Sequence, residues 1–300
     1  MTLYTNSGGT LTEVSEKPYK LEREIQSVFE SNLELIMSLK LVRSEFSIKS
    51  KRIDTLAYDE STKAFIIVEY KRDKSISVVD QGFSYLSLML ENKADFIVEY
   101  NEQLKRNLKR NDVDWSQTRV VFVSPSFTDN QIQATNFKDI AIELWEVRQY
   151  KNGTVAINQI KKNKSAESIK PLTEQNKVLK HVIDEIKVYT EEQHCEAATP
   201  EMAELYEKFK NGILNLADDI DVQPKKVYIA FKRDRNVVDI EIMKSTLKIY
   251  LNAKWGKIDD SKHLARNVSD VGHYGNGDYQ ILVNSDKDLE YIMSLVKQVL

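Results

Sequence analysis

The chain is poor in the features of secreted and membrane proteins. Its 300 residues contain a single cysteine, Cys195, so an internal disulfide cannot form. No apolar stretch reaches the roughly 18 residues that a membrane-spanning helix needs, and no apolar run near the N-terminus is typical of a signal peptide. These absences favour a soluble protein of the reducing cytoplasm without a membrane partner.

An excess of positive charge is also lacking. The sequence holds 43 lysines and arginines against 46 acidic residues, a net charge of −3, which is unlike proteins that coat nucleic acid nonspecifically. Nucleic-acid binding would therefore depend on local patches. The clearest is the segment 104–110, with Lys105, Arg106, Lys109 and Arg110. A run of charges is usually a solvated face, so phosphate contact is one of two interpretations.

The segment from Arg52 to Lys71 is typical of a β-hairpin. Its turn falls at residues 59–62, and its second strand is apolar until it ends in Glu69 and Lys71. The apolar run 66–68 favours a central strand covered on both faces. Two charged side chains on such a buried strand are unfavourable unless they are paired or bind a ligand. The alternative is a solvated edge on which they form weak ion pairs.

The pairing register of this hairpin brings two acids together. A register that pairs Leu56 with Ile67 also places Asp54 opposite Glu69, with their Cβ atoms roughly 4.5–5.5 Å apart. Both carboxylates then lie beside the ammonium group of Lys71. Like charges at this distance repel unless a cation lies between them, and oxygen ligands suit hard ions. The hairpin therefore predicts a site for Mg²⁺ or Mn²⁺.

The spacing resembles the active-site signature of the PD-(D/E)xK nuclease superfamily. Asp54 corresponds to the first acid and Glu69-Tyr70-Lys71 to the E-x-K element, although Ile53 stands where a strict signature has proline. The resemblance implies that Asp54, Glu69 and the Tyr70 carbonyl hold the metal ion. It also implies that Lys71 positions the attacking water or stabilises the transition state.

Two further features extend the resemblance, which covers roughly residues 18–150. Gln81 and Tyr85 resemble the Q-x-x-x-Y motif of the RecB-type branch, and positions four apart share a helix face. The alternative for Tyr85 is a core residue with a tethered hydroxyl. A helix expected over residues 18–39 would supply another acid: Glu22 falls inside its apolar stripe, whereas Glu24 lies at the edge. Either could instead favour the helix N-terminus through the helix dipole.

The order of expected elements predicts two domains. Strands alternating with helices imply an α/β fold with a mixed central sheet, which matches a restriction-endonuclease-like core over residues 1–160. The apolar runs that support it lie at 95–99, 118–124 and 140–147. A polar linker at 161–171 leads to a smaller α+β domain, 172–300, which resembles an uncharacterised domain family found behind such nucleases.

The second domain offers few chemical signals. Helices are expected at 171–193 and 200–218, the latter capped by Thr199, and a final helix is expected to begin at Asp286. The expected strands lie at 226–231, 237–242, 246–251 and 279–283. The glycine-rich loop 272–277 does not match a phosphate-binding motif, because no helix follows it.

The sequence as a whole indicates a metal-dependent nuclease that hydrolyses phosphodiester bonds in DNA. Restriction, defence and repair are the settings that the resemblance suggests. The alternative is a non-catalytic nucleic-acid-binding or assembly protein that keeps the fold, against which the intact acid-acid-lysine set argues. Whether RNA is also a substrate, and whether the chain forms a homo-oligomer, is left open.

Overall fold

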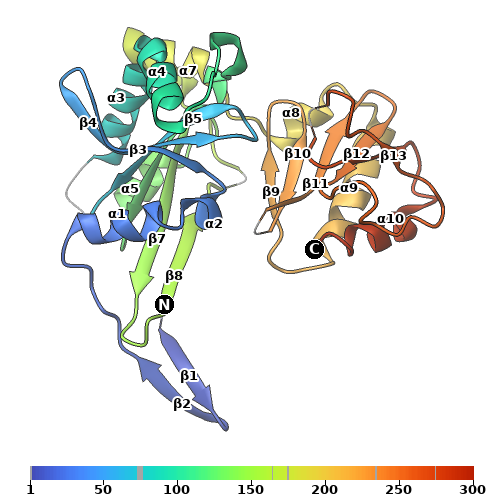
Figure 1. Ribbon diagram of the computed structural model, residues 1–300, viewed down its shortest axis with the longest axis horizontal. Helices are drawn as coiled ribbons and strands as arrows, with labels where there is room; N and C mark the ends of the chain where they lie inside the picture. Colours follow the sequence, from blue (N-terminus) through green and yellow to red (C-terminus); the bar gives the residue numbers. More distant parts are fainter. Residues whose placement is uncertain (1, 73–76, 164, 174–175, 234, 274) are drawn as a thin grey trace. The chain divides into compact units, whose positions relative to one another are not determined.

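The computed structural model describes residues 2–72, 77–163, 165–173, 176–233, 235–273 and 275–300 (Figure 1). The chain forms two compact units, residues 1–188 and 189–300. The predicted boundary is therefore wrong: residues 161–188 belong to the first unit. The reason is apolar packing, because Ile169, Val182, Ile183 and Ile186 are buried in the first core.

A mixed six-stranded sheet forms the centre of the first unit. Its order is β3-β4-β5-β6-β7-β8, with β5–β6 and β6–β7 parallel and the other pairs antiparallel. The strands are β3 (Lys40–Ile48), β4 (Lys51–Asp59), β5 (Ala64–Tyr70), β6 (Arg119–Ser124), β7 (Ile142–Gln149) and β8 (Val155–Ile160). Every residue of β5 is buried, as its apolar run 66–68 predicts for a central strand.

Helices cover both faces of this sheet (Figure 1). On one face lie α1 (Glu22–Glu30) and α2 (Leu33–Met37). The other face is covered by α3 (Val78–Glu91), α4 (Lys93–Leu104), α5 (Asp129–Thr135) and α7 (Lys177–Glu185), with the short α6 (Lys170–Thr173) before α7. The predicted fold class, an α/β core with a mixed central sheet followed by a smaller α+β domain, is confirmed.

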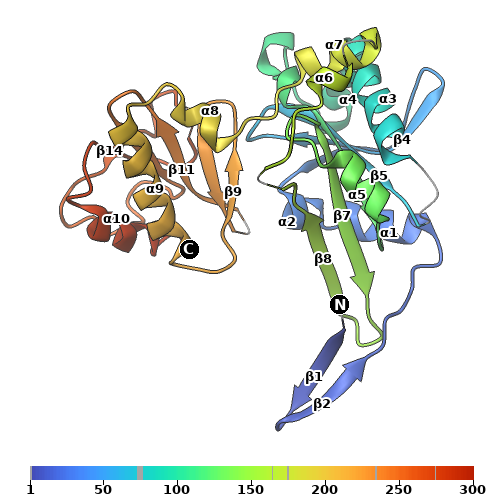
Figure 2. The ribbon, with the colours of Figure 1, turned by 180° about the vertical axis from the view of Figure 1, so that it is seen from behind.

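Several elements differ from the sequence-based expectations. The helix expected over 18–39 is divided into α1 and α2, with Ser31 and Asn32 between them. The apolar run 95–99 lies inside α4, because Phe96, Ile97 and Tyr100 recur at helical spacing toward the core. The strands β3 and β8 were not predicted, nor was the exposed hairpin formed by β1 (Leu3–Ser7) and β2 (Thr10–Val14), which projects beyond β7 and β8 (Figure 2).

The second unit is an antiparallel six-stranded sheet with helices packed on its apolar face (Figure 2). Its order is β13-β14-β12-β11-β10-β9. The strands are β9 (Asp221–Pro224), β10 (Ile229–Lys232), β11 (Asn236–Ile242), β12 (Leu247–Leu251), β13 (Arg266–Asn267) and β14 (Tyr279–Val283), and the helices are α8 (Glu191–Cys195), α9 (Pro200–Leu214) and α10 (Leu289–Val296).

The four predicted strands of this unit are present, and Thr199 caps α9 by accepting from the Met202 amide. The single helix expected over 171–193 is instead the separate helices α6, α7 and α8, and the last helix has its N-cap at Asp288 rather than Asp286. In the part of the chain that the structure describes, no helix is both long enough and apolar enough to cross a membrane.

Candidate functional site

The predicted register of the β4–β5 hairpin is confirmed. Leu56 pairs with Ile67, and the ladder ends one step further at Thr55 and Val68. Asp54 is therefore the next residue opposite Glu69, as predicted. Beyond the ladder, an Asp54 carboxylate oxygen accepts a hydrogen bond from the Tyr70 backbone amide at 3.0 Å. The side chain of the first acid is thus tied to the strand that bears the second.

Glu69 and Lys71 form a buried ion pair at the end of β5. The Lys71 Nζ lies 2.8 Å from Glu69 Oε1, and the exposed fractions of the two residues are only 9% and 4%. The solvated-edge alternative is therefore wrong. Glu69 also accepts a hydrogen bond from Gln81 Nε2 at 2.9 Å, so the strand end and α3 meet at this carboxylate.

Two acceptors in this cluster lack a partner. Glu69 Oε2 and Gln81 Oε1 are both buried, and neither has a hydrogen-bond partner among the described residues. Buried polar atoms are nearly always satisfied, so each exception requires an explanation. Both orphaned atoms are oxygens, and a cation with oxygen ligands would satisfy them. The donor set therefore fits a hard divalent metal ion.

The approach of α3 to the sheet is what brings Gln81 to Glu69. A Cβ atom on the adjacent Gly82 would lie 2.4 Å from Cδ1 of Ile142, so a larger residue would force the Ile142 side chain to shift. Tyr85, one turn further on, accepts from Gln81 Nε2 at 3.2 Å and donates to the Arg52 carbonyl at 3.2 Å. Its ring is buried, so Tyr85 is both a core residue and a link from α3 to β4.

In the described part of the chain, the two carboxylates Asp54 and Glu69 have only one cation, Lys71, beside them in the cluster. Burial, followed by the charge of Glu69, raises the pKa of Asp54 to about 6, although the Tyr70 amide and Lys71 act in the opposite direction. Lys71 is bound to Glu69, so it offsets one of the two negative charges directly. A second positive charge at this point would favour the ionised form of Asp54.

Glu22 and Glu24 have different partners near the start of α1. Glu22 Oε1 accepts from the Arg72 amide at 3.0 Å, directly after Lys71, whereas Glu24 accepts from the amide of Lys20 at 2.7 Å. Glu22 is thus tied to the strand end that carries the acid pair. Across the described residues, no three His, Cys, Asp or Glu side chains form a group that could hold a metal ion. The ligand role of Glu22 stays a prediction.

The basic segment lies away from the acid pair. Lys105 follows α4, Lys109 precedes η1 (Arg110–Asp112), and Trp115 in η2 (Trp115–Gln117) stacks on Phe65 at the start of β5, with ring centroids 5.5 Å apart. Glu69 lies near the other end of this strand. Its seven residues span roughly 20 Å at about 3.3 Å per residue. Contact between the segment 105–110 and phosphates stays a prediction.

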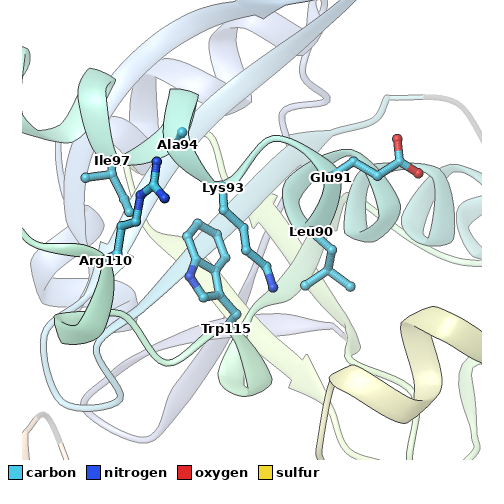
Figure 3. Close-up of a pocket in the computed structure, with 7 residues that line it drawn as sticks. All are labelled: Leu90, Glu91, Lys93, Ala94, Ile97, Arg110 and Trp115. Carbon is cyan, nitrogen blue, oxygen red and sulfur yellow. The ribbon is translucent and has the colours of Figure 1, made fainter.

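A pocket of about 310 Å³ lies at this same distant end (Figure 3). Leu90, Ile97 and Trp115 give it apolar lining, the Lys93 side chain lies between Trp115 and Leu90, and Arg110 lies next to Ile97 (Figure 3). Lys93 is already paired with Glu185 and lies 5.7 Å from the Trp115 ring centre. The pocket contains none of the predicted catalytic residues, so the candidate chemistry depends on the strand end and not on this cavity.

Sequence reasoning missed Gln26 and Glu30 on α1. Gln26 Nε2 donates to the Asp54 carbonyl at 3.0 Å, and Glu30 accepts from Thr55 Oγ1 at 2.5 Å. The sequence held a signal, because Gln26 directly follows Ile25 and comes four residues after Glu22, on the side of the helix that carries the apolar stripe; the structure buries it. Gly82, next to Gln81, was a third missed position.

Two comparisons concern the sequence. Residues 191–298 match the family described as Domain of unknown function (DUF5655), which bears out the expectation of an uncharacterised C-terminal domain. Over its full length the chain is similar to an uncharacterized protein of Haemophilus influenzae. The two are 55% identical over 300 residues, which is 100% of this chain and 99% of that protein.

Solved structures show weaker similarity. The EndoMS–dsDNA2 complex is 22% identical over 38% of this chain and 42% of that chain, with a TM-score of 0.26. A repair endonuclease from Pyrococcus abyssi is 19% identical over 39% and 43%, with a TM-score of 0.22, and Pyrococcus furiosus SfsA in complex with Ca²⁺ is 15% identical over 54% and 77%, with a TM-score of 0.28. The chain spans less than half the length of the first two, and at these TM-scores the site must be argued from its own geometry.

Proposed function

We propose that this chain, which belongs to one family with the uncharacterized Haemophilus influenzae protein, hydrolyses phosphodiester bonds in DNA with a divalent metal ion. The observation that carries the proposal is the pair of buried orphaned oxygens, Glu69 Oε2 and Gln81 Oε1, beside Asp54. A structural ion pair has no need of acceptors without partners. DNA as the substrate follows from the resemblance of the hairpin to the PD-(D/E)xK signature.

The residues that would hold the ion are Asp54, Glu69 and the backbone carbonyl of Tyr70. Mg²⁺ prefers such oxygen ligands and usually keeps several waters, so two carboxylates and a carbonyl are sufficient protein ligands. When bound, the ion lowers the pKa of a water and stabilises charge on the phosphoryl oxygens. Glu22 would assist through water from its position beside Arg72.

The neighbouring side chains have distinct tasks in this proposal. Lys71 holds its ammonium group 2.8 Å from Glu69, where it orients the attacking water or offsets charge that develops on the phosphate. Gln81 fixes the rotamer of Glu69 through a 2.9 Å hydrogen bond. Tyr85 links α3 to the Arg52 carbonyl and so keeps Gln81 in reach of the carboxylate.

A cleavage panel tests the proposal. Linear, circular, single-stranded and flapped DNA, with RNA counterparts, are incubated with wild-type protein in Mg²⁺, Mn²⁺ or EDTA. We expect cleavage of at least one DNA with metal and none in EDTA. Glu69→Gln, which keeps the shape of the side chain, should abolish it, and the matched control Asp239→Asn in the second unit should not. Metal-dependent activity that survives Glu69→Gln would refute the site. Metal-independent binding without cleavage would favour the non-catalytic alternative.

A further inference from the structure

The interface between α1 and the central sheet contains polar side chains where an apolar contact would suffice. Ile25 and Phe29 of α1 are fully buried among Ile66, Val68 and Tyr70 of β5 and their neighbours. Gln26 and Glu30 belong to the same helix, yet both turn toward β4 and make hydrogen bonds there. Burial of polar groups is unfavourable unless they are paired, so this placement calls for a function.

These side chains form one connected network. Gln26 Nε2 has two N–H groups and three acceptors within reach: the backbone carbonyl oxygen of Asp54 at 3.0 Å, Glu30 Oε1 at 3.1 Å and Ser44 Oγ at 3.3 Å. Thr55 Oγ1 donates to the same Glu30 oxygen at 2.5 Å and lies 3.2 Å from the hydroxyl oxygen of Tyr70. The network thus reaches Asp54 through its backbone and Tyr70 through its side chain.

Both points of attachment belong to proposed metal ligands. Gln26 binds the backbone carbonyl of Asp54. The network also holds Tyr70 through its hydroxyl group. The amide of Tyr70 donates to the Asp54 carboxylate, and its carbonyl is the third proposed metal ligand. The two strands pair only as far as Thr55 and Val68, so no ladder hydrogen bond fixes Asp54 on β5. The network supplies the missing restraint from the opposite face of the sheet.

We infer that Gln26 and Glu30 are positioning residues for the metal site: they hold the Asp54 and Tyr70 backbone segments in place from behind the sheet. This inference rests on the proposed function. The contrast in hydrogen-bond satisfaction supports it. No polar side-chain atom of Gln26, Glu30 or Thr55 is among the buried atoms without a partner, whereas Glu69 and Gln81 each have one. Side chains that are already hydrogen-bonded restrain geometry, and the orphaned acceptors of Glu69 and Gln81 are open to a ligand.

Four variants of the full chain test the inference. Gln26→Leu and Glu30→Ala remove the two central groups, and Glu30→Gln keeps an acceptor oxygen for Thr55. Ile25→Val is the matched control, because it trims a buried side chain of the same helix that makes no hydrogen bond with the network. Mn²⁺ binding is measured by calorimetry, the metal dependence of cleavage by titration, and thermal unfolding in EDTA.

We expect Gln26→Leu and Glu30→Ala to weaken Mn²⁺ affinity about 10-fold, as removal of outer-shell partners does elsewhere. Glu30→Gln should stay close to wild type, and Ile25→Val should unfold at lower temperature with unchanged Mn²⁺ affinity. Wild-type affinity in both Gln26→Leu and Glu30→Ala would overturn the inference alone. Wild-type protein that neither binds Mn²⁺ nor cleaves DNA would overturn the proposed function, and the inference with it. Glu30 is only partly buried, so Glu30→Ala keeps the test valid if Gln26→Leu does not fold.

Discussion

Asp54 and Asp239 are aspartates on strands of the two different units, and burial raises the pKa of each to about 6. Their partners differ. Asp239 accepts from the Asn276 amide at 2.6 Å, from Asn276 Nδ2 at 2.7 Å and from Asn236 Nδ2 at 3.1 Å. Asp54 accepts from one amide and lies beside a second carboxylate. A raised pKa alone does not mark a functional site. The two aspartates differ in their surroundings: Asp239 is fully hydrogen-bonded to asparagines, whereas acceptor oxygens without a partner among the described residues lie beside Asp54.

The surroundings of Asp239 explain the glycine-rich loop. A Cβ on Gly275 would lie 2.3 Å from the Tyr250 ring, and one on Gly277, where φ is +85°, would lie 2.0 Å from the Leu251 carbonyl. His273 stacks on the Tyr250 ring with centroids 5.3 Å apart. The glycines thus let the loop lie on the sheet, where Asp239 binds it. This carboxylate has a structural task, whereas the open acceptors beside Asp54 indicate a ligand.

The strongest test of this contrast removes either carboxylate of the acid pair in the first unit. Asp54→Ala and Glu69→Ala should each lower metal-dependent cleavage by at least about 1,000-fold, since the proposed ion loses a ligand whose charge it needs. Unfolding in EDTA should be unchanged or shifted to higher temperature for Asp54→Ala, because repulsion with Glu69 is removed. Initial rates measure the loss of cleavage, and thermal unfolding followed by circular dichroism measures the change in stability. Wild-type rates in either variant would contradict the assignment.

Truncation tests whether the units are as independent as their separate cores suggest. Residues 1–188 should fold and retain cleavage, and residues 189–300 should fold without activity. Residues 1–160 should not fold, because deletion removes Ile169, Val182, Ile183 and Ile186 from the core. At about 1.5–3 kcal/mol per buried side chain, the loss is roughly 6–12 kcal/mol, comparable with the whole stability of a domain. Circular dichroism and cleavage of the three fragments check this. An active 1–160 fragment would restore the boundary predicted from sequence.

Asp239→Ala should show the opposite behaviour to Asp54→Ala. It leaves the donors of Asn276 and Asn236 without their acceptor, which should lower the free energy of unfolding of the second unit by about 1–3 kcal/mol. Cleavage should be unchanged, since every proposed ligand lies in the first unit. Urea denaturation and rate measurements provide the two readouts. A large loss of activity would show that Asp239 takes part in the reaction and would contradict its assignment as a structural residue.

Much of the site was predictable because it is local in sequence. The alternation of side chains and the hairpin turn fix the Leu56–Ile67 register, which places Asp54 opposite Glu69. The i, i+4 spacing of Gln81 and Tyr85 predicted their shared face, and the two side chains are hydrogen-bonded. These relations need only the periods of a strand and a helix.

The missed features are long-range. Gln26 meets the Asp54 carbonyl across 28 positions, and no local period specifies which strand a buried glutamine will bind. The polar composition of 161–171 suggested a linker, but the buried Ile183 and Ile186 that follow it return the chain to the first core. Likewise Phe96 and Ile97 fit a short strand as well as a helix until Tyr100 is placed against the same core.

The pH dependence of stability should separate the two aspartates when metal is added. Each pKa is raised in the folded state above its unfolded value, so each contribution to stability is present at low pH and is lost as the pH rises through about 6. In EDTA, the unfolding temperature should fall as the pH rises from 4.5 to 7. Asp54→Asn and Asp239→Asn should each make this fall smaller, because each removes one of the two titrating carboxyl groups. Saturating Mg²⁺ should abolish the Asp54 component alone. An Mg²⁺ effect of equal size in Asp54→Asn and wild type would contradict this.

The smallest effect is expected from the basic segment, because it lies at the end of β5 remote from the acids. If Lys105, Arg106, Lys109 and Arg110 contact phosphates, replacing all four with glutamine should weaken DNA binding and reduce the salt dependence of affinity by a slope of about 0.9 per lost contact. Cleavage at saturating DNA should be unchanged. A control variant removes the same charge from the exposed Lys254, Lys257, Lys287 and Lys297 of the second unit. Fluorescence anisotropy at several salt concentrations measures both variants in EDTA. If the two variants have equal slopes, the segment is a solvated face. If the first slope alone is reduced, DNA extends from the acid pair to the far end of the strand, and the first unit both binds and cleaves.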